Sequence, residues 1–257
     1  MTRQLRSQIA ATCFLAAAMC AGTSAATVFF DDFNDGSVTN DLPLASNGIP
    51  VKWTDGGSGI YDASSGDYIF TPTQPQTGAY MTSNALDFPL LDVSIRAQGR
   101  VTGGNGSDLI LTARNQIFGD TQHYLGGIGY FPNLGGTVVF LGKNSLGLNY
   151  TQFGGNPVMP FDIRQEDAVV QLDVIGNKLS LWAWRAGDTP PELPQLSAID
   201  NTYTTAGPVR IVGGTGTNRD SITIYRYVHV ADMHIPEPAT LLLALFASLK
   251  MLVWRRR

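Results

Sequence analysis

Cysteine is almost absent from this sequence of 257 residues. The two cysteines, Cys13 and Cys20, both lie within residues 1–25. Residues 26–234 therefore contain no disulfide, no thiol nucleophile and no cysteine-ligated metal site. Histidine is also scarce, and the three histidines form no His-x-His or His-Glu-x-x-His pattern, which argues against a zinc hydrolase.

Positive charge is scarce in the central part of the chain. Six of the 17 lysines and arginines lie in the two ends, against one of the 21 aspartates and glutamates, which leaves residues 26–234 with a formal charge near −9. Nucleic-acid binding needs a basic surface, so a nucleic-acid partner is not expected. An acidic body is compatible with neutral glycans, with cations or with solubility alone.

The N-terminal segment has the pattern of an export signal. Arg3 and Arg6 precede an apolar run from Ile9 to Ala21, and small residues follow at positions 23–26. This order predicts a Sec signal peptide over residues 1–25, with an apolar signal helix that the Sec translocon handles. Cys20 leaves a lipoprotein signal as an alternative.

The C-terminal segment, residues 235–257, combines three features in a fixed order. It begins with Pro236, Glu237 and Pro238, continues as an apolar run that ends at Trp254, and finishes with three arginines. The run is somewhat short of the roughly 20 residues that cross a bilayer comfortably, and terminal arginines favour the cytoplasmic side. A buried core helix is the alternative, but such a helix would show a polar face. The arginines are Arg255, Arg256 and Arg257.

These three features resemble the PEP-CTERM sorting signal of Gram-negative bacteria that make exopolysaccharide. The resemblance implies a hydrophobic sorting helix that holds the chain in the inner membrane until an exosortase cuts near Pro236-Glu237-Pro238. The final location would then be the cell surface or the extracellular matrix. The resemblance covers about the last 23 residues and implies nothing about the rest of the chain.

The body alternates between apolar and polar residues with a period of two. The clearest stretches are residues 91–97, 169–174, 179–184 and 222–230, and Gly, Asn, Asp and Pro bound them. This pattern is typical of β-strands. Ile175-Gly176-Asn177-Lys178 predicts a tight hairpin turn. The Pro-rich residues 189–194 predict a surface loop.

The order of these segments resembles the concanavalin A-like jelly roll of laminin-G and glucanase domains. The resemblance rests on the opening Asp31-Asp32-Phe33, the hairpin VQLDVIGNKLSLWAW and a last strand that ends near Asp232. The predicted fold is all-β, a jelly-roll sandwich of two antiparallel sheets over residues 26–234. In this fold the last strand returns beside the first one.

A structural calcium ion is one candidate cofactor. Several jelly rolls of this kind hold Ca²⁺ between the first and last strands, which implies a site formed by Asp31, Asp32 and Asp232. Four oxygen-bearing side chains between residues 31 and 35 would supply hard ligands. The alternative is an ordinary strand end, where Asp and Asn bond their own backbone.

Aromatic side chains are the candidate ligand-binding residues. Trp182 and Trp184 share one face of a strand, and Tyr124 is another candidate for stacking on a sugar ring. If Leu179 and Leu181 face inward, the tryptophans face outward and form an exposed aromatic patch, which usually indicates binding. Packing in the core is the alternative.

The favoured function is a non-catalytic module that binds extracellular polysaccharide. An enzyme of the 3-keto-disaccharide hydrolase type, to which the opening is similar, is the second hypothesis. It is disfavoured because the Glu-x-Asp-x-x-Glu motif of jelly-roll glucanases is absent and the body contains only two glutamates. A purely structural matrix protein is the third hypothesis.

Overall fold

The computed structural model describes residues 26–38, 43–57, 59–73, 80–116, 122–145, 149–216, 218 and 220–232. The predicted signal helix, the sorting motif with its arginines and the apolar C-terminal run lie outside these residues. Thr27 to Ile235 belong to one compact unit. Within the described residues, no helix has the length and apolarity that a membrane span requires.

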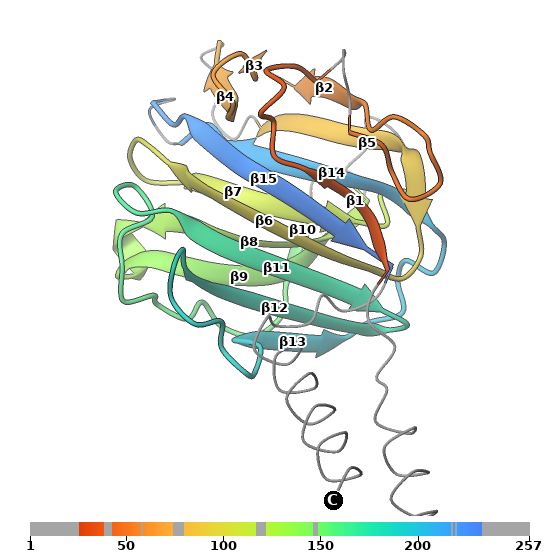
Figure 1. Ribbon diagram of the computed structural model, residues 1–257. Helices are drawn as coiled ribbons and strands as arrows, with labels where there is room; N and C mark the ends of the chain where they lie inside the picture. The colour runs from red at the N-terminus through yellow and green to blue at the C-terminus, as the bar shows by residue number, and fades with distance from the viewer. Residues whose placement is uncertain are drawn as a thin grey trace, which may run out of the picture. The chain divides into compact units, whose positions relative to one another are not determined.

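The unit is a sandwich of two antiparallel sheets, as predicted (Figure 1). Across the eight-stranded sheet the order is β13 (Leu196–Ile199), β12 (Lys178–Arg185), β11 (Ala168–Ile175), β6 (Val93–Val101), β15 (Thr223–Ala231), β4 (Tyr68–Pro72) and β3 (Gly59–Asp62), and β1 (Thr27–Asp31) also pairs with β15. Across the seven-stranded sheet the order is β10 (Asn149–Gln152), β9 (Gly136–Ser145), β8 (His123–Phe131), β7 (Ser107–Ala113), β14 (Gly207–Gly214), β5 (Tyr80–Leu90) and β2 (Trp53–Gly57). A 3-10 turn, Pro132–Leu134, joins β8 to β9.

The strands that the period-two pattern predicted are present. Residues 91–97, 169–174, 179–184 and 222–230 fall largely in β6, β11, β12 and β15. Gly176 and Asn177 form the two-residue turn between β11 and β12, where Ile175 pairs with Lys178. The last strand returns beside the first, because β1 pairs with β15 (Figure 1).

The hydrophobic core lies between the two sheets. Most strands give alternate side chains to this layer, so Leu179 and Leu181 of β12 and Leu109 and Leu111 of β7 are fully buried. Trp53 of β2 is buried in this core next to the end of β1, where its indole N–H donates to the carboxylate of Asp31. Because no cysteine is available in the body, the sheets are held together by this packing and by hydrogen bonds rather than by a disulfide.

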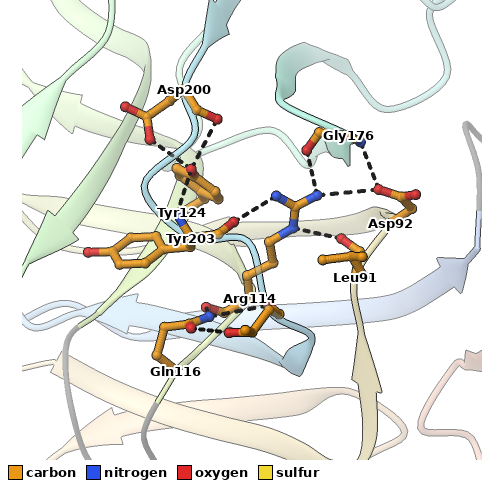
Figure 2. Close-up of polar contacts among 9 residues, drawn as sticks. Leu91, Asp92, Arg114, Gln116, Tyr124, Gly176, Asp200 and Tyr203 are labelled. Atoms are coloured by element: carbon orange, nitrogen blue, oxygen red, sulfur yellow. Dashed lines mark hydrogen bonds and ion pairs between the residues drawn. The ribbon is translucent and has the colours of Figure 1, made fainter.

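A buried arginine joins four chain segments at one end of the sandwich (Figure 2). Arg114 follows β7, and its side chain is almost fully buried. Its guanidinium donates to the carbonyls of Leu91 (2.7 Å), Tyr203 (2.8 Å) and Gly176 (2.7 Å) and to the carboxylate of Asp92 (3.3 Å). These partners lie in three different connections, so one side chain holds three loops in place.

Replacing Arg114 with methionine removes every one of these donors and leaves buried carbonyls without partners. We expect Arg114→Met to lower the free energy of unfolding by about 3 kcal/mol or more. Arg114→Lys should fall between this variant and the wild type, because lysine keeps the charge but not the planar set of donors. Urea unfolding of the purified protein measures both changes.

Arg185→Met is the matched control. Arg185 pairs with Glu166 at 3.0 Å, but both side chains are about 40% exposed. An exposed pair of this kind contributes at most about 1 kcal/mol. An equal loss of stability in the Arg114 and Arg185 variants would contradict the role given to Arg114.

Candidate functional site: a groove on the seven-stranded sheet

The outer face of the seven-stranded sheet carries a groove of about 500 Å³. Its lining comes from β5, β7, β8, β9, β10 and β14, from the turn between β8 and β9 and from the connection after β10, so the groove lies across the middle of this sheet. Because strands alternate their side chains, residues next to the core residues of each strand face the groove. On β7 these residues are Asp108, Ile110 and Thr112.

The floor of the groove is apolar and separate from the core between the sheets. Ile110, Leu125 and Val212 form a small buried cluster, and Phe140 packs against it. The glycine at position 127 deepens the floor, because a Cβ there would lie only 2.9 Å from the Phe140 ring and 3.1 Å from Ile110. A larger residue at this position would displace these side chains.

Two tyrosines line the groove at its open side. Tyr80 of β5 is 42% exposed and Tyr150 of β10 is 45% exposed. The charge of Asp108 and burial raise the pKa of Tyr80 to about 12, and burial together with Tyr80 raises the pKa of Tyr150 to about 12. Both hydroxyls therefore stay protonated at neutral pH and can donate hydrogen bonds.

Polar groups occupy the two ends of the floor. Asp108 lies at one end, beside Gly214 of β14, and is 5% exposed. Arg210 lies at the other end, where its Nε donates to Asn84 Oδ1 at 2.5 Å. Arg210 is four residues before Gly214 on β14, so the two charged residues are roughly 13 Å apart along the strand.

Burial raises the pKa of Asp108 to about 7, although the Gly214 N–H lowers it in part. A Cβ at Gly214 would collide with the Asp108 carboxylate, so glycine is required for this close approach. Asp108 Oδ1 is buried and has no hydrogen-bond partner among the described residues. One acidic side chain with an unused acceptor atom is therefore built into the groove.

The predicted aromatic residues lie elsewhere. Leu179 and Leu181 do face inward, as expected, and Trp182 and Trp184 lie on the outer face of the eight-stranded sheet. Trp182 is partly exposed, whereas Trp184 is only 8% exposed, and the Arg96 guanidinium lies 5.4 Å from its ring centre. Trp184 is thus covered rather than open for stacking.

Tyr124 is also unavailable to a ligand. Its ring is fully buried, and its hydroxyl donates to Asp200 Oδ1 at 2.7 Å and accepts the Tyr203 N–H at 3.0 Å (Figure 2). The expectation that it stacks on a sugar is corrected for this reason, because the side chain points into the core.

The three aspartates predicted to bind calcium do not come together. Asp31 pairs with Val228 of β15, whereas Asp232 follows Ala231 at the other end of the β1–β15 pair. Asp31 points inward and accepts the Phe33 N–H (2.9 Å) and the Trp53 indole N–H (2.8 Å). Burial raises its pKa to about 6 despite these two bonds.

The register therefore corrects the predicted metal site. Asp32 is exposed and accepts the backbone N–H of Asn34, as in an ordinary turn. No group of three or more His, Cys, Asp or Glu side chains suited to a metal occurs within the described ranges. The residues that were expected to hold calcium do not fit it.

Sequence reasoning missed the groove, although two signals point to it. The stretch SDLILTA places an aspartate within a strand whose residues are all buried. The stretch HYLGGIGYF places glycines at alternate positions 127 and 129, on one face of β8. Glycine inside a strand often marks a place where a ligand or another backbone approaches closely.

The fold is similar to that of solved lectin domains, although no protein-family model and no curated protein matches the chain. The VIP36 exoplasmic/lumenal domain, solved in a Ca²⁺/Man2-bound form, matches with a TM-score of 0.52 and 14% identity, over 77% of this chain and 87% of that domain. A legume lectin-like domain from Entamoeba histolytica matches with a TM-score of 0.50 and 12% identity, over 68% and 88%.

A xylan beta-1,4-xylosidase from Bacillus halodurans is a further match. Its TM-score is 0.51 at 9% identity, and the alignment covers 79% of this chain but 38% of the enzyme. At such identities these likenesses show the fold alone. The body therefore has a lectin-like jelly-roll fold of two antiparallel sheets, as the sequence predicted.

The buried carboxylate of Asp108 makes stability depend on pH. Its pKa is raised from 3.8 to about 7, so between these values the folded state keeps a proton that the unfolded state has lost. Stability from this group is fully present below pH 3.8 and is lost as the pH rises through about 7. Between pH 3.8 and about 7, the free energy of unfolding of the wild type should fall by up to about 4 kcal/mol relative to that of Asp108→Asn.

Urea unfolding at a series of pH values measures this difference. Asp188→Asn is the control, because Asp188 lies exposed in the turn after β12. Its stability curve should run parallel to that of the wild type. If the Asp108→Asn curve also ran parallel, the raised pKa would be refuted.

Proposed function

We propose that the protein binds extracellular polysaccharide in the groove of the seven-stranded sheet, without cleaving it. The observation that carries this proposal is the combination of two half-exposed tyrosines with an apolar floor and a buried polar group at each end. A sugar ring has apolar C–H faces and hydroxyl edges. Tyrosine rings contact the faces, while a few fixed polar groups orient the hydroxyls.

The size and place of the groove also favour a glycan. A volume of about 500 Å³ lies within the range of roughly 300–1,000 Å³ typical of ligand sites. The groove runs across several strands and is lined from both sides, so a chain polymer can lie in it. Two of the similar structures, a domain solved in a Ca²⁺/Man2-bound form and a legume lectin-like domain, are consistent with this ligand class.

Hydrolysis of a sugar polymer is the second candidate. The usual mechanism needs two carboxyl groups, one on each side of the bond that breaks. Asp108 is the single acidic side chain among the described residues that line the groove. This lining favours binding over hydrolysis. A structural matrix protein without a ligand is the third candidate, but a groove with an unused buried acceptor is not needed for that role.

We further propose that the chain is exported and sorted to the cell surface or matrix. This proposal rests on the terminal sequences: the Sec-type pattern of residues 1–25 and the Pro236-Glu237-Pro238 motif with its apolar run and arginines. The Sec translocon, the inner membrane and an exosortase are the partners that this route requires. A polysaccharide ligand and a surface location agree with each other.

Removing either groove tyrosine should weaken polysaccharide binding. We expect Tyr80→Ala and Tyr150→Ala each to reduce affinity about tenfold, because each removes a ring from the rim. The purified full-length chain is mixed with polysaccharide from the producing organism and sedimented. The pellet is assayed for protein and the supernatant for small sugars.

Phe30→Ala is the matched control, since Phe30 is 45% exposed but lies on β1 in the other sheet. It should sediment with the polysaccharide as the wild type does. An equal loss of polysaccharide binding in Tyr80→Ala, Tyr150→Ala and Phe30→Ala would contradict binding in the groove. Small sugars in the supernatant would instead select the hydrolase.

The sorting proposal has a test of its own in a host that has the exosortase. With Pro236, Glu237 and Pro238 replaced by alanine, the chain should stay full-length in the membrane fraction, whereas the wild type should be shortened. The same replacement at Pro190, Pro191 and Glu192, in the loop after β12, is the control and should be processed normally. Normal processing of both variants would refute the role of the motif.

A further inference from the structure

The acidic end of the groove holds a carboxylate that is buried and has no opposite charge beside it. Asp108 is 5% exposed, and its Oδ1 atom has no hydrogen-bond partner among the described residues. No ion pair involves it within the described part of the chain. A buried carboxylate with one unsatisfied oxygen and no cation beside it costs free energy, so its presence in a ligand-sized groove points to a partner that the ligand brings.

The groups that face Asp108 come from three strands. Tyr80 of β5 lies close enough for the charge of Asp108 to raise its pKa, and the backbone N–H of Gly214 on β14 donates to the carboxylate. The charge of Asp108 also contributes to the raised pKa of Tyr225 on β15. This tyrosine lies on the core side of the sheet, where its hydroxyl donates to the carbonyls of Ile110 and Val212. None of these groups is cationic. Arg210 lies at the far end of the groove.

The surroundings of Asp108 suit a cation better than a neutral hydroxyl. Aromatic rings attract cations through their negative faces, and Tyr80, which also lines the groove, lies close enough to Asp108 to feel its charge. The apolar floor of Ile110, Val212 and Phe140 excludes water, which strengthens the attraction between a cation and the carboxylate. The formal charge near −9 of the body adds a long-range attraction.

We propose that the groove selects glycans that carry a free primary amine, and that the ammonium group pairs with Asp108 beside Tyr80. The inference rests on the proposed function, because it assigns a ligand class to the same groove. An amino sugar unit satisfies the unused acceptor with an N–H donor and neutralises the buried charge in the same contact. N-acetylation of that amine removes the positive charge and adds bulk, so an acetylated unit binds less tightly.

The experiment compares three soluble oligosaccharides of equal length: a glucosamine oligomer, an N-acetylglucosamine oligomer and a cello-oligosaccharide. Binding to the purified full-length chain is measured by calorimetry at a fixed ionic strength. We expect the glucosamine oligomer to bind at least about tenfold more tightly than either of the others. Asp108→Asn should remove this preference.

Two control variants separate a specific contact from general attraction. Asp188→Asn removes the same charge from an exposed turn and should keep the preference. Tyr80→Phe keeps the aromatic ring and should also keep the preference for the glucosamine oligomer, whereas Tyr80→Leu should reduce this preference. Thermal melting of each variant shows whether it is folded, and the two Tyr80 variants test the same contact without touching the carboxylate.

The outcomes distinguish this inference from the function on which it rests. Equal affinity for the three oligomers, lost in Tyr80→Ala, would overturn the amine preference and leave glycan binding in the groove intact. An amine preference that Asp108→Asn and Asp188→Asn weaken equally would overturn it too, since general electrostatics would then explain it. If groove variants changed the affinity for none of the oligomers, both proposals would fail.

Discussion

The burial of one guanidinium group governs how this sandwich is closed at one end. Arg114 has a φ of 53°, a left-handed conformation that a residue with a side chain adopts only at a cost. The hydrogen bonds to Leu91, Tyr203, Gly176 and Asp92 offset that cost, and the strained turn aims the side chain at all four. Because the body has no disulfide, these hydrogen bonds provide the crosslinks between the three connections at this end. It fixes the end of β7, the strand that carries Asp108 and Ile110 into the groove.

The groove results from what the outer face of the sheet lacks. Ordinary side chains at positions 127, 129 and 214 would collide with Phe140, Phe131 and Asp108. The glycines let these three side chains lie close to the sheet, where they line the hollow above it. The tyrosines at positions 80 and 150 stand on strands on either side of that hollow. The ligand site is therefore formed by a rigid sheet rather than by loops, so its geometry is set before a ligand arrives, which lowers the entropic cost of binding.

The sequence predicted the strands, the hairpin and the pairing of the first and last strands, because period-two alternation and turn residues act locally. It placed Leu179 and Leu181 inside for the same reason. It could not show that Trp184 is covered, since that depends on Arg96, which lies 88 positions away in the sequence on β6. Nor could the sequence show that the Asp31 side chain points inward, because its partner Trp53 is 22 residues away and on the other sheet.

The buried acidic groups on the two outer faces differ in how well they are satisfied. On the eight-stranded sheet Arg96 donates to Gln171 at 2.7 Å, and Ser94 donates to Asp173 at 2.6 Å, so neighbouring strands satisfy one another. On the seven-stranded sheet Asp108 keeps a buried oxygen without a partner. A face that carries a buried carboxyl group with an unsatisfied oxygen gains free energy when a ligand supplies the missing donor, and that gain is available as binding affinity.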